Sequence, residues 1–414
     1  MRRWSAAGLM LLSLLLSGCW DRREIEDTIY VASIGVDAQG DEYLWTFRVV
    51  EAERLTLGML TAVTAEPGRL ASGVITVRAT SLQQAVQLLQ PSIMRVISLE
   101  HVRWIGFGEE VANQGLGPLL SQFLRHNQIR RSANIYLVRG TALYPFLNNR
   151  PVGDLNPMKF FETARLVQKR FHLSPPVQLQ HYYARLSSPG VDPMIAVVGV
   201  NEMAKEQPGS ELPAMGGRSL KGGEVPRNGG NPAEFMGTAI FRGDRLAGTL
   251  SVDETAAVLA LRGEMGKVYM SVPDPREEGV YITIRLHQEN KPRYRADFRN
   301  HRPIIHVRLQ FEAELLSTPG MTDYSQPENR RALERSIAND YLAPLFRSLT
   351  DKVYSDWGAD PAGFGQLFRS RFATFDDWVA YRWTDKVPDL KVTVESDVFI
   401  RRFGMLLSSD IPEN

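Results

Sequence analysis

The chain has 414 residues, 43% of them hydrophobic and 23% charged, which is typical of a globular protein long enough for two or three domains. Its formal net charge is +1, and loss of Arg2 and Arg3 with an export signal would change this to −1. A charge so close to zero gives no indication of binding to nucleic acid or of attraction to an anionic membrane.

The N-terminus has the layout of a bacterial lipoprotein signal. Two arginines precede an apolar run over 6–16, which is shorter than the roughly 20 residues that a membrane-spanning helix needs. The segment Leu16-Ser17-Gly18-Cys19 matches a lipobox, whose cysteine receives a diacylglyceryl group before cleavage. We therefore predict a signal peptide over 1–18 and a lipid anchor on Cys19, since two or more acyl chains hold a protein stably on a bilayer.

The cysteine count agrees with this prediction. Cys19 is the only cysteine, so it has no partner for an internal disulfide, and exported proteins seldom carry a free thiol without a use for it. The alternative is an ordinary secretory signal with an incidental cysteine. Beyond the signal, no second stretch is long and apolar enough to cross a membrane, so we expect a soluble body tethered at its N-terminus.

Residues 19–204 are predicted to form an N-terminal mixed α/β region of one or two subdomains. Alternating apolar residues predict a hairpin over 28–36 and 43–49. Ser81 can cap a helix whose apolar side chains recur on one face. Further strands are expected over 74–78, 101–107, 133–138 and 193–200, and further helices over 109–112, 119–124 and 163–183, the last interrupted at Pro175-Pro176. Strands that alternate with helices indicate a mixed α/β layer.

Residues 205–232 are rich in glycine and proline and contain little that is apolar. This composition predicts a linker or a long exposed loop. The glycines do not form a Walker motif, because neither Gly216-Gly217-Arg218 nor the segment 263–268 has the required Gly-Lys-Ser/Thr ending.

Residues 233–414 are predicted to form a C-terminal α+β domain. A hairpin is expected from 237–241 to 246–250, followed by a helix with a capping box between Ser251 and Glu254. Strands are expected over 268–272, 280–286, 304–315 and 392–400. Short turns between most of them favour antiparallel pairing.

The longest helix is predicted to begin at a second capping box, between Ser325 and Glu328, and to reach Val353. Pro344 should kink it, because proline removes a backbone donor. The predicted fold class is therefore α+β: an elongated, mixed α/β multidomain body with mainly antiparallel sheets and packed helices.

We find no pattern that indicates catalysis, a cofactor or a metal. The seven histidines lack the spacing of a metal site, and the nearest pair, His301 and His306, is better explained as surface histidines. No Gly-x-Ser-x-Gly elbow is present, and Glu312 and Glu314 are neighbours on one predicted strand face. The sequence therefore predicts a protein that is not an enzyme.

The run Cys19-Trp20-Asp21-Arg22-Arg23-Glu24-Ile25, which continues to Ile34-Gly35-Val36-Asp37, resembles the start of the Ger(x)C family, the lipoprotein C subunits of spore germinant receptors. Later stretches follow the order of that family: Glu100-His101 through Phe107-Gly108-Glu109-Glu110 to Gly115 and Leu119, Gly237-Thr238-Ala239-Ile240-Phe241 with Leu246-Ala247-Gly248 and Glu254-Thr255, and Phe399-Ile400-Arg401-Arg402-Phe403-Gly404. The resemblance spans nearly the whole mature chain, and its N-terminal run is the most specific part. The glycine-rich insertion over 205–232 and Pro344 depart from the simplest family pattern.

The resemblance implies a protein anchored on the outer face of the inner spore membrane. It also implies two integral-membrane partners, the A-type and B-type receptor subunits, and a shared role in nutrient-triggered germination. It brings no catalytic residue and no cofactor. Trp20, Asp21 and Glu24 lie immediately beyond the lipid and are candidate contacts with these partners. Equally, Trp20 can rest in the membrane interface while Asp21 and Glu24 hold the first strand in place.

Two alternatives belong to other classes of protein. A solute-binding lipoprotein of an importer usually has two lobes with parallel sheets, which the antiparallel second half disfavours. An anchored hydrolase is disfavoured by the missing catalytic motifs.

Overall fold

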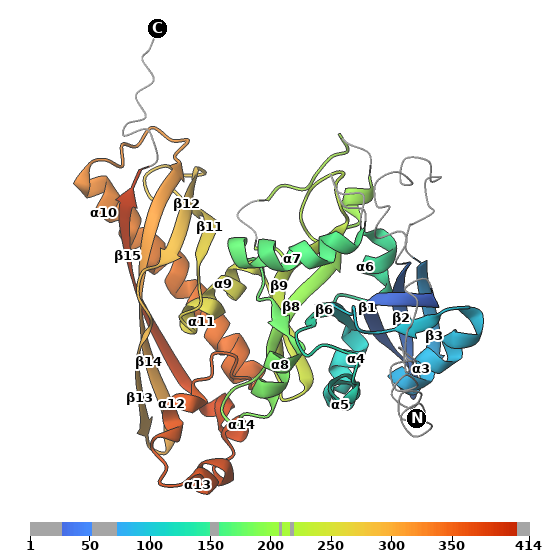
Figure 1. The fold of residues 1–414 in the computed structure, drawn as a ribbon. Coiled ribbons are helices and arrows are strands. Elements are labelled where there is room, and N and C mark those ends of the chain that lie inside the picture. Colours follow the sequence, from blue (N-terminus) through green and yellow to red (C-terminus); the bar gives the residue numbers. More distant parts are fainter. Residues whose placement is uncertain (1–26, 52–72, 150–156, 207–208, 216–218, 404–414) are drawn as a thin grey trace, which may run out of the picture.

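The computed structural model describes residues 27–51, 73–149, 157–206, 209–215 and 219–403. Within these ranges the chain forms two β-sheets with packed helices, and the two sheets lie side by side (Figure 1). This arrangement confirms the predicted mixed α/β fold with mainly antiparallel strand pairs.

The first sheet is built around parallel strands. Its strands are β1 (Thr28–Gln39), β2 (Glu42–Glu51), β3 (Gly73–Ala79), β4 (Val96–Ser98), β5 (Trp104–Gly108), β6 (Asn134–Val138), β7 (Val177–Gln178), β8 (Met194–Val200), β9 (Ala233–Arg242) and β10 (Arg245–Leu250). The described order is β10-β9-β8-β6-β5-β1-β2-β3, with β4 beside β1 and β7 beside β6. Strands β1, β5, β6 and β8 run parallel to one another, and antiparallel hairpin strands extend both ends.

Helices cover both faces of this sheet. They are α3 (Leu82–Leu89), α4 (Glu109–Gln114), α5 (Gly117–Arg125), α6 (Leu143–Asn148), α7 (Pro157–Phe171) and α8 (Leu179–Leu186). One face packs on α3, α5 and α8, and the other on α6. Strands buried on both faces are apolar throughout, which explains continuous runs such as Met194-Ile195-Ala196-Val197 in β8. The predicted first hairpin and the Ser81 cap are confirmed.

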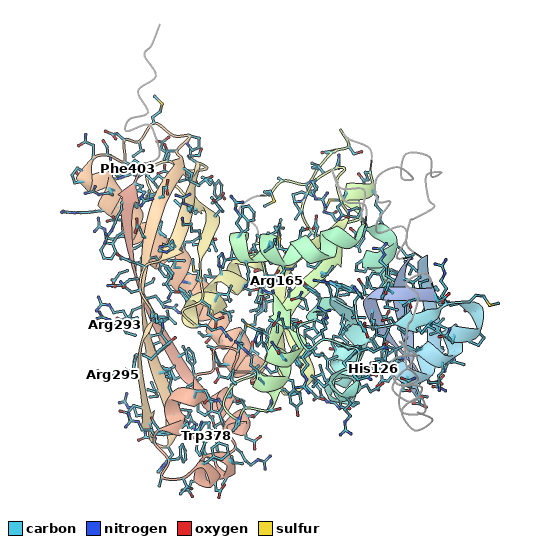
Figure 2. All side chains as sticks on the ribbon, in the orientation of Figure 1. His126, Arg165, Arg293, Arg295, Trp378 and Phe403 are labelled. Carbon is cyan, nitrogen blue, oxygen red and sulfur yellow. The ribbon has the colours of Figure 1, made fainter. Side chains whose placement is uncertain are left out.

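The second sheet follows an alternating pattern. Its strands are β11 (Lys267–Pro273), β12 (Tyr281–Gln288), β13 (Arg293–Arg299), β14 (Arg302–Ser317) and β15 (Lys391–Arg402). β12 and β13 pair with different parts of one side of β14, and β15 pairs with β14 in parallel. Every second residue of β14 from Pro303 to Leu315 is buried, and the residues between them are exposed or half-buried. In Figure 2, Arg293 and Arg295 project from β13 away from the helices.

The helices of the second half are α9 (Val252–Leu261), α10 (Pro327–Ser336), α11 (Ala343–Thr350), α12 (Gly365–Arg369), α13 (Phe375–Ala380) and α14 (Trp383–Lys386). The predicted capping box at Ser325 and Glu328 is wrong: the helix begins one residue later, after Gln326, whose side chain makes no cap. A π-helical segment, Ile337–Leu342, separates α10 from α11, and Pro344 lies in the first turn of α11. The wider π-helical turn accommodates the missing proline donor without ending the helix.

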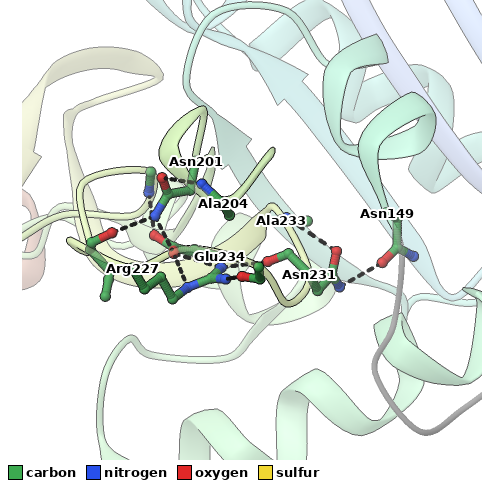
Figure 3. Close-up of polar contacts among 10 residues, drawn as sticks. Asn149, Asn201, Ala204, Arg227, Asn231, Ala233 and Glu234 are labelled. Atoms are coloured by element: carbon green, nitrogen blue, oxygen red, sulfur yellow. Dashed lines mark hydrogen bonds and ion pairs between the residues drawn. The ribbon is translucent and has the colours of Figure 1, made fainter. Parts of the chain in front are cut away.

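The described part of residues 205–232 lacks helices and strands beyond a short turn that ends at Lys205, yet it is packed against the first sheet. Arg227 donates from Nε to Glu234 Oε1 at 2.9 Å, and Asn201 donates to Val225 O and Glu234 Oε1 (Figure 3). Asn231 reaches Asn149 at 2.8 Å. The expectation of an exposed loop is therefore wrong for residues 219–232.

The hairpin β9–β10, which the sequence analysis assigns to the C-terminal domain, completes the first sheet by pairing with β8. The first sheet thus takes strands from both sides of the segment 205–232. The position of the domain border itself stays a prediction.

Candidate functional site at the junction of the two sheets

The residues that the sequence singles out, Cys19, Trp20, Asp21 and Glu24, lie outside the described residues, which begin at residue 27. Within the described ranges, no group of three His, Cys, Asp or Glu side chains is placed to hold a metal ion. No helix of those ranges is long and apolar enough to cross a bilayer. What the structure does bring together is a set of buried charges and a cavity where the two sheets meet.

Asp360 is the centre of a junction that we define as residues 189–193 of the first half and 358–366 of the second. Its Oδ1 accepts hydrogen bonds from the backbone N–H groups of Gly363 and Phe364, at 2.8 and 3.0 Å. Its Oδ2 accepts from Gly365 N at 2.8 Å and from Trp383 Nε1 at 3.0 Å. Four donors on one carboxylate hold this loop of the second half in a single conformation.

Asp192 connects that loop to the first sheet. Its backbone N–H donates to Asp360 O, and its Oδ2 accepts from Asp360 N, both at 2.8 Å. Its Oδ1 accepts from Gly243 N, in the turn between β9 and β10, at 2.8 Å. The two aspartates therefore form a two-way bridge between the halves.

Burial makes these two carboxylates unusual. Asp360 is completely buried, and this burial, reinforced by the charge of Asp192, raises its pKa to about 7. Burial also raises the pKa of Asp192. Carboxyl groups with raised pKa values are common at functional sites, but buried structural networks also raise the pKa values of their carboxyl groups.

Glycines allow the two halves to approach closely. A Cβ atom on Gly365 would lie 2.6 Å from the Cα of Gly190, too near for any other residue. Gly190 has φ +92°, which favours glycine, and its own Cβ would meet Trp378 at 2.8 Å. The bridge thus depends on backbone contacts that side chains would obstruct.

Helix α9 forms a second connection. The predicted capping box is confirmed, with Ser251 and Glu254 bonded reciprocally. Lys352, in the π-helical segment Asp351–Asp356 that follows α11, donates to Glu254, and Tyr341, in the π-helical segment before α11, donates to Asp253 at 3.2 Å. Burial acts to raise the pKa of Glu254, but the bonds from Lys352 and Ser251 outweigh it and lower that pKa. The carboxylate therefore stays charged and fixes α9 against the helical segment 327–356.

A cavity of about 640 Å³ opens between α7, α8 and the end of α9. Met194, two positions after Asp192, and Leu259 of α9 contribute apolar walls, and His172 and Arg185 contribute polar ones. The His172 ring lies so close to Gly266 that a Cβ there would be 2.0 Å from its Cε1. Burial lowers the pKa of His172, which keeps the ring neutral at pH 7.

The carboxyl ends of the parallel strands, where α/β sheets commonly bind ligands, are occupied by the protein itself. Asp37 Oδ1 accepts from Ala142 N at 2.7 Å and would lie 2.1 Å from a Cβ on Gly108. Burial raises the pKa of Asp37 to about 6. This carboxyl group holds the start of α6, which is a structural role.

The sequence does not reveal Asp192, Asp360 or the cavity residues as functional candidates. The capping box was visible because its two partners are three residues apart, whereas Asp192 and Asp360 are separated by 168 positions. The one local signal was the turn-forming sequence Asp360-Pro361-Ala362-Gly363, which does not reveal its partner.

Comparison with known protein families finds one match in each half of the chain. Residues 21–200 match the family described as "Spore germination protein N-terminal domain", and residues 236–404 match "Spore germination B3/ GerAC like, C-terminal". The two matches lie on either side of the glycine-rich insertion over 205–232.

Three proteins of Bacillus subtilis (strain 168) are similar over nearly their whole length. YfkR, a protein of the spore germination type, is 26% identical over 96% of both chains. Spore germination protein KC is 21% identical over 98% of this chain and 97% of its own. Spore germination protein B3 is 20% identical over 96% of both.

A solved structure, "Crystal Structure of the GerBC protein", matches with a TM-score of 0.51 and 17% identity, covering 89% of this chain and 96% of that one. This likeness concerns the fold. Together with the two family matches and the full-length relatives, it leads to one assignment: the chain belongs to the Ger(x)C family of spore germination proteins.

Proposed function

We propose that the chain is the C-type subunit of a spore nutrient germinant receptor, anchored by lipid on Cys19 and acting by contact with two integral-membrane subunits. The observation that carries this proposal is the full-length similarity to spore germination proteins KC and B3, combined with a lipobox at the N-terminus. The importer alternative receives no support from these relatives.

Contact, not catalysis, is the proposed mode of action. The junction carboxylates Asp192 and Asp360 are saturated with backbone donors and hold the halves together, so they are poorly placed to transfer protons to a substrate. A body held together in this way can present a defined surface to a membrane partner.

The anchor determines which end of the body lies near the membrane. β1 starts at Thr28, nine positions after Cys19, and an extended chain of that length spans at most about 30 Å. The start of β1 should therefore lie within that distance of the outer face of the inner spore membrane. Trp20, Asp21 and Glu24 belong to this tether, which makes them candidate contacts.

The anchor is tested by fractionating spores that carry Cys19→Ala in place of the native chain. Without the thiol no diacylglyceryl group can be attached, so the variant should be absent from lipid-modified protein and lost from the membrane fraction. Ser17→Ala is the matched control, because it keeps a small residue in the lipobox and should leave the protein anchored. A Cys19→Ala variant that remains lipid-modified and membrane-bound would contradict the proposal.

The same spores can test the tether contacts. Asp21→Lys combined with Glu24→Lys should leave the anchor intact but reduce co-purification of the two membrane subunits. Glu278→Lys, an exposed charge reversal in the turn between β11 and β12, is the control. Unchanged co-purification with the double variant would favour the simpler role of Asp21 and Glu24 in holding the first strand.

A further inference from the structure

The cavity between α7, α8 and α9 has the size and position of a ligand site. Its volume of about 640 Å³ falls within the range of roughly 300 to 1,000 Å³ that small-molecule sites occupy. It lies between elements of the two halves, and such interfaces are a preferred location for binding sites. The family relationship assigns nothing to this cavity.

Several polar atoms of its walls are buried without a hydrogen-bond partner in the described structure. Gln168 is 1% exposed, and both its amide nitrogen and its amide oxygen are unpaired. Ser174 is also 1% exposed, with an unpaired hydroxyl. The Gln168 amide faces the hydroxyl of Tyr136, but these atoms do not complete a hydrogen bond of standard geometry. Buried polar groups are normally paired, but these atoms have almost no accessible surface, so they would reach a ligand in the cavity only after a change of side-chain rotamer.

Two further residues of the cavity wall also have unpaired polar atoms. His172 Nδ1 and Arg185 Nη1 are both buried and lack partners among the described residues. Arg185 Nη1 can only donate, whereas His172 Nδ1 can donate or accept according to which ring nitrogen carries the proton. The four side chains come from α7, the loop that follows it, and α8.

The charge of the walls favours an anion. Lys169 and Arg185 contribute two cations, while the one carboxylate, Glu264, is already held by Arg262 through bonds of 2.6 and 2.9 Å. Arg185 Nη2 stands 4.0 Å from Glu264 Oε1, at the limit of an ion pair, and its Nη1 is buried without a partner among the described residues. A guanidinium is suited to a carboxylate, because its planar N–H groups match the two carboxylate oxygens.

The remaining walls are apolar, since Met194, Leu259 and Val177 line the cavity opposite these donors. We propose that the cavity binds a small organic carboxylate, with its acid group on Arg185 and Lys169 and its apolar part against Met194 and Leu259. This site is independent of the proposed anchor and of the receptor partners.

The test is ligand-observed NMR with the complete chain purified in detergent. The probes are benzoate, hexanoate and succinate, each compared with its uncharged amide. At least one carboxylate should bind with a Kd near or below about 1 mM, and its amide at least about tenfold more weakly. Arg185→Gln and Lys169→Gln should each weaken that carboxylate by about tenfold or more.

Arg170→Gln is the matched control, because Arg170 is exposed on the same helix, next to Lys169, and does not line the cavity. It should bind like the native chain in the same detergent. Lys169 is exposed, so its variant should fold even if Arg185→Gln does not. Absence of binding by all three carboxylates, equal binding of the amides, or equal binding by Lys169→Gln and Arg170→Gln would overturn the proposal.

Discussion

At the scale of single residues, Asp360 dominates the electrostatics of the junction. The carboxylate accepts four hydrogen bonds, which favour its charged form, while complete burial beside Asp192 favours the neutral form. Burial prevails, so the pKa rises to about 7. The two halves are therefore joined by a group that titrates near neutral pH.

This titration predicts how stability changes with pH. Asp360 has a pKa of about 7 in the folded state and near 4 in the unfolded chain, so the folded state binds the proton more tightly. The stability that this contributes is complete below about pH 4 and is lost as the pH rises through 7. Between pH 5 and pH 8 the contribution should fall by roughly 2–3 kcal/mol, because nearly two pKa units of the difference are lost over that range.

Urea unfolding of the full chain from pH 5 to pH 8 measures this effect when native and Asp360→Asn proteins are compared. The variant should be less stable at every pH, because its amide nitrogen faces backbone donors, but it should lack this part of the pH dependence. Asp376→Asn, an exposed aspartate in the first turn of α13, should keep the native pH dependence. An identical pH slope in native and Asp360→Asn proteins would show that Asp360 does not titrate in this range.

At the scale of elements, most helices and strands could be predicted because their signals are local. The alternation in β14, the capping box of α9 and the Ser81 cap all depend on residues a few positions apart. β13 was not predicted, because its inward residues Ala296 and Phe298 are only half-buried and arginines flank them. The packing of residues 219–232 was also missed, since polar contacts such as Arg227 with Glu234 leave no apolar pattern.

That packing predicts a strong effect at Gly199 of β8. A Cβ there would lie 2.0 Å from Gly222 O and 2.3 Å from Gly222 C, and backbone atoms cannot move aside as a side chain can. Gly199→Ala should therefore lower the free energy of unfolding by about 1–3 kcal/mol. It should also increase protease cleavage within residues 219–232.

The control is Gly73→Ala in β3, where the nearest atom to a new Cβ is a side-chain methyl of Val49 at 3.1 Å. This change should cost less than about 1 kcal/mol. Native stability in Gly199→Ala would mean that residues 219–232 do not rest on β8 in solution.

At the scale of the whole molecule, sequence could predict the fold class but not the connections between its parts. The hairpin β9–β10 joins the first sheet, and β15 pairs in parallel with β14, through contacts between residues far apart in the chain. The junction of Asp192 with Asp360 and the cavity beside it arise only once both halves are folded. The lipobox, in contrast, is a local motif, so the anchor could be predicted although its residues lie outside the described ranges.

The central claim, that this protein is a receptor subunit for nutrient-triggered germination, is tested most directly by deleting its gene. Germination of the resulting spores is followed by their loss of optical density, with nutrients and with a trigger that does not depend on nutrients. We predict that the response to one set of nutrients is lost and returns with the native chain, while nutrient-independent germination stays intact. An unchanged nutrient response, or a defect confined to uptake of a solute that the purified protein binds tightly, would contradict the claim.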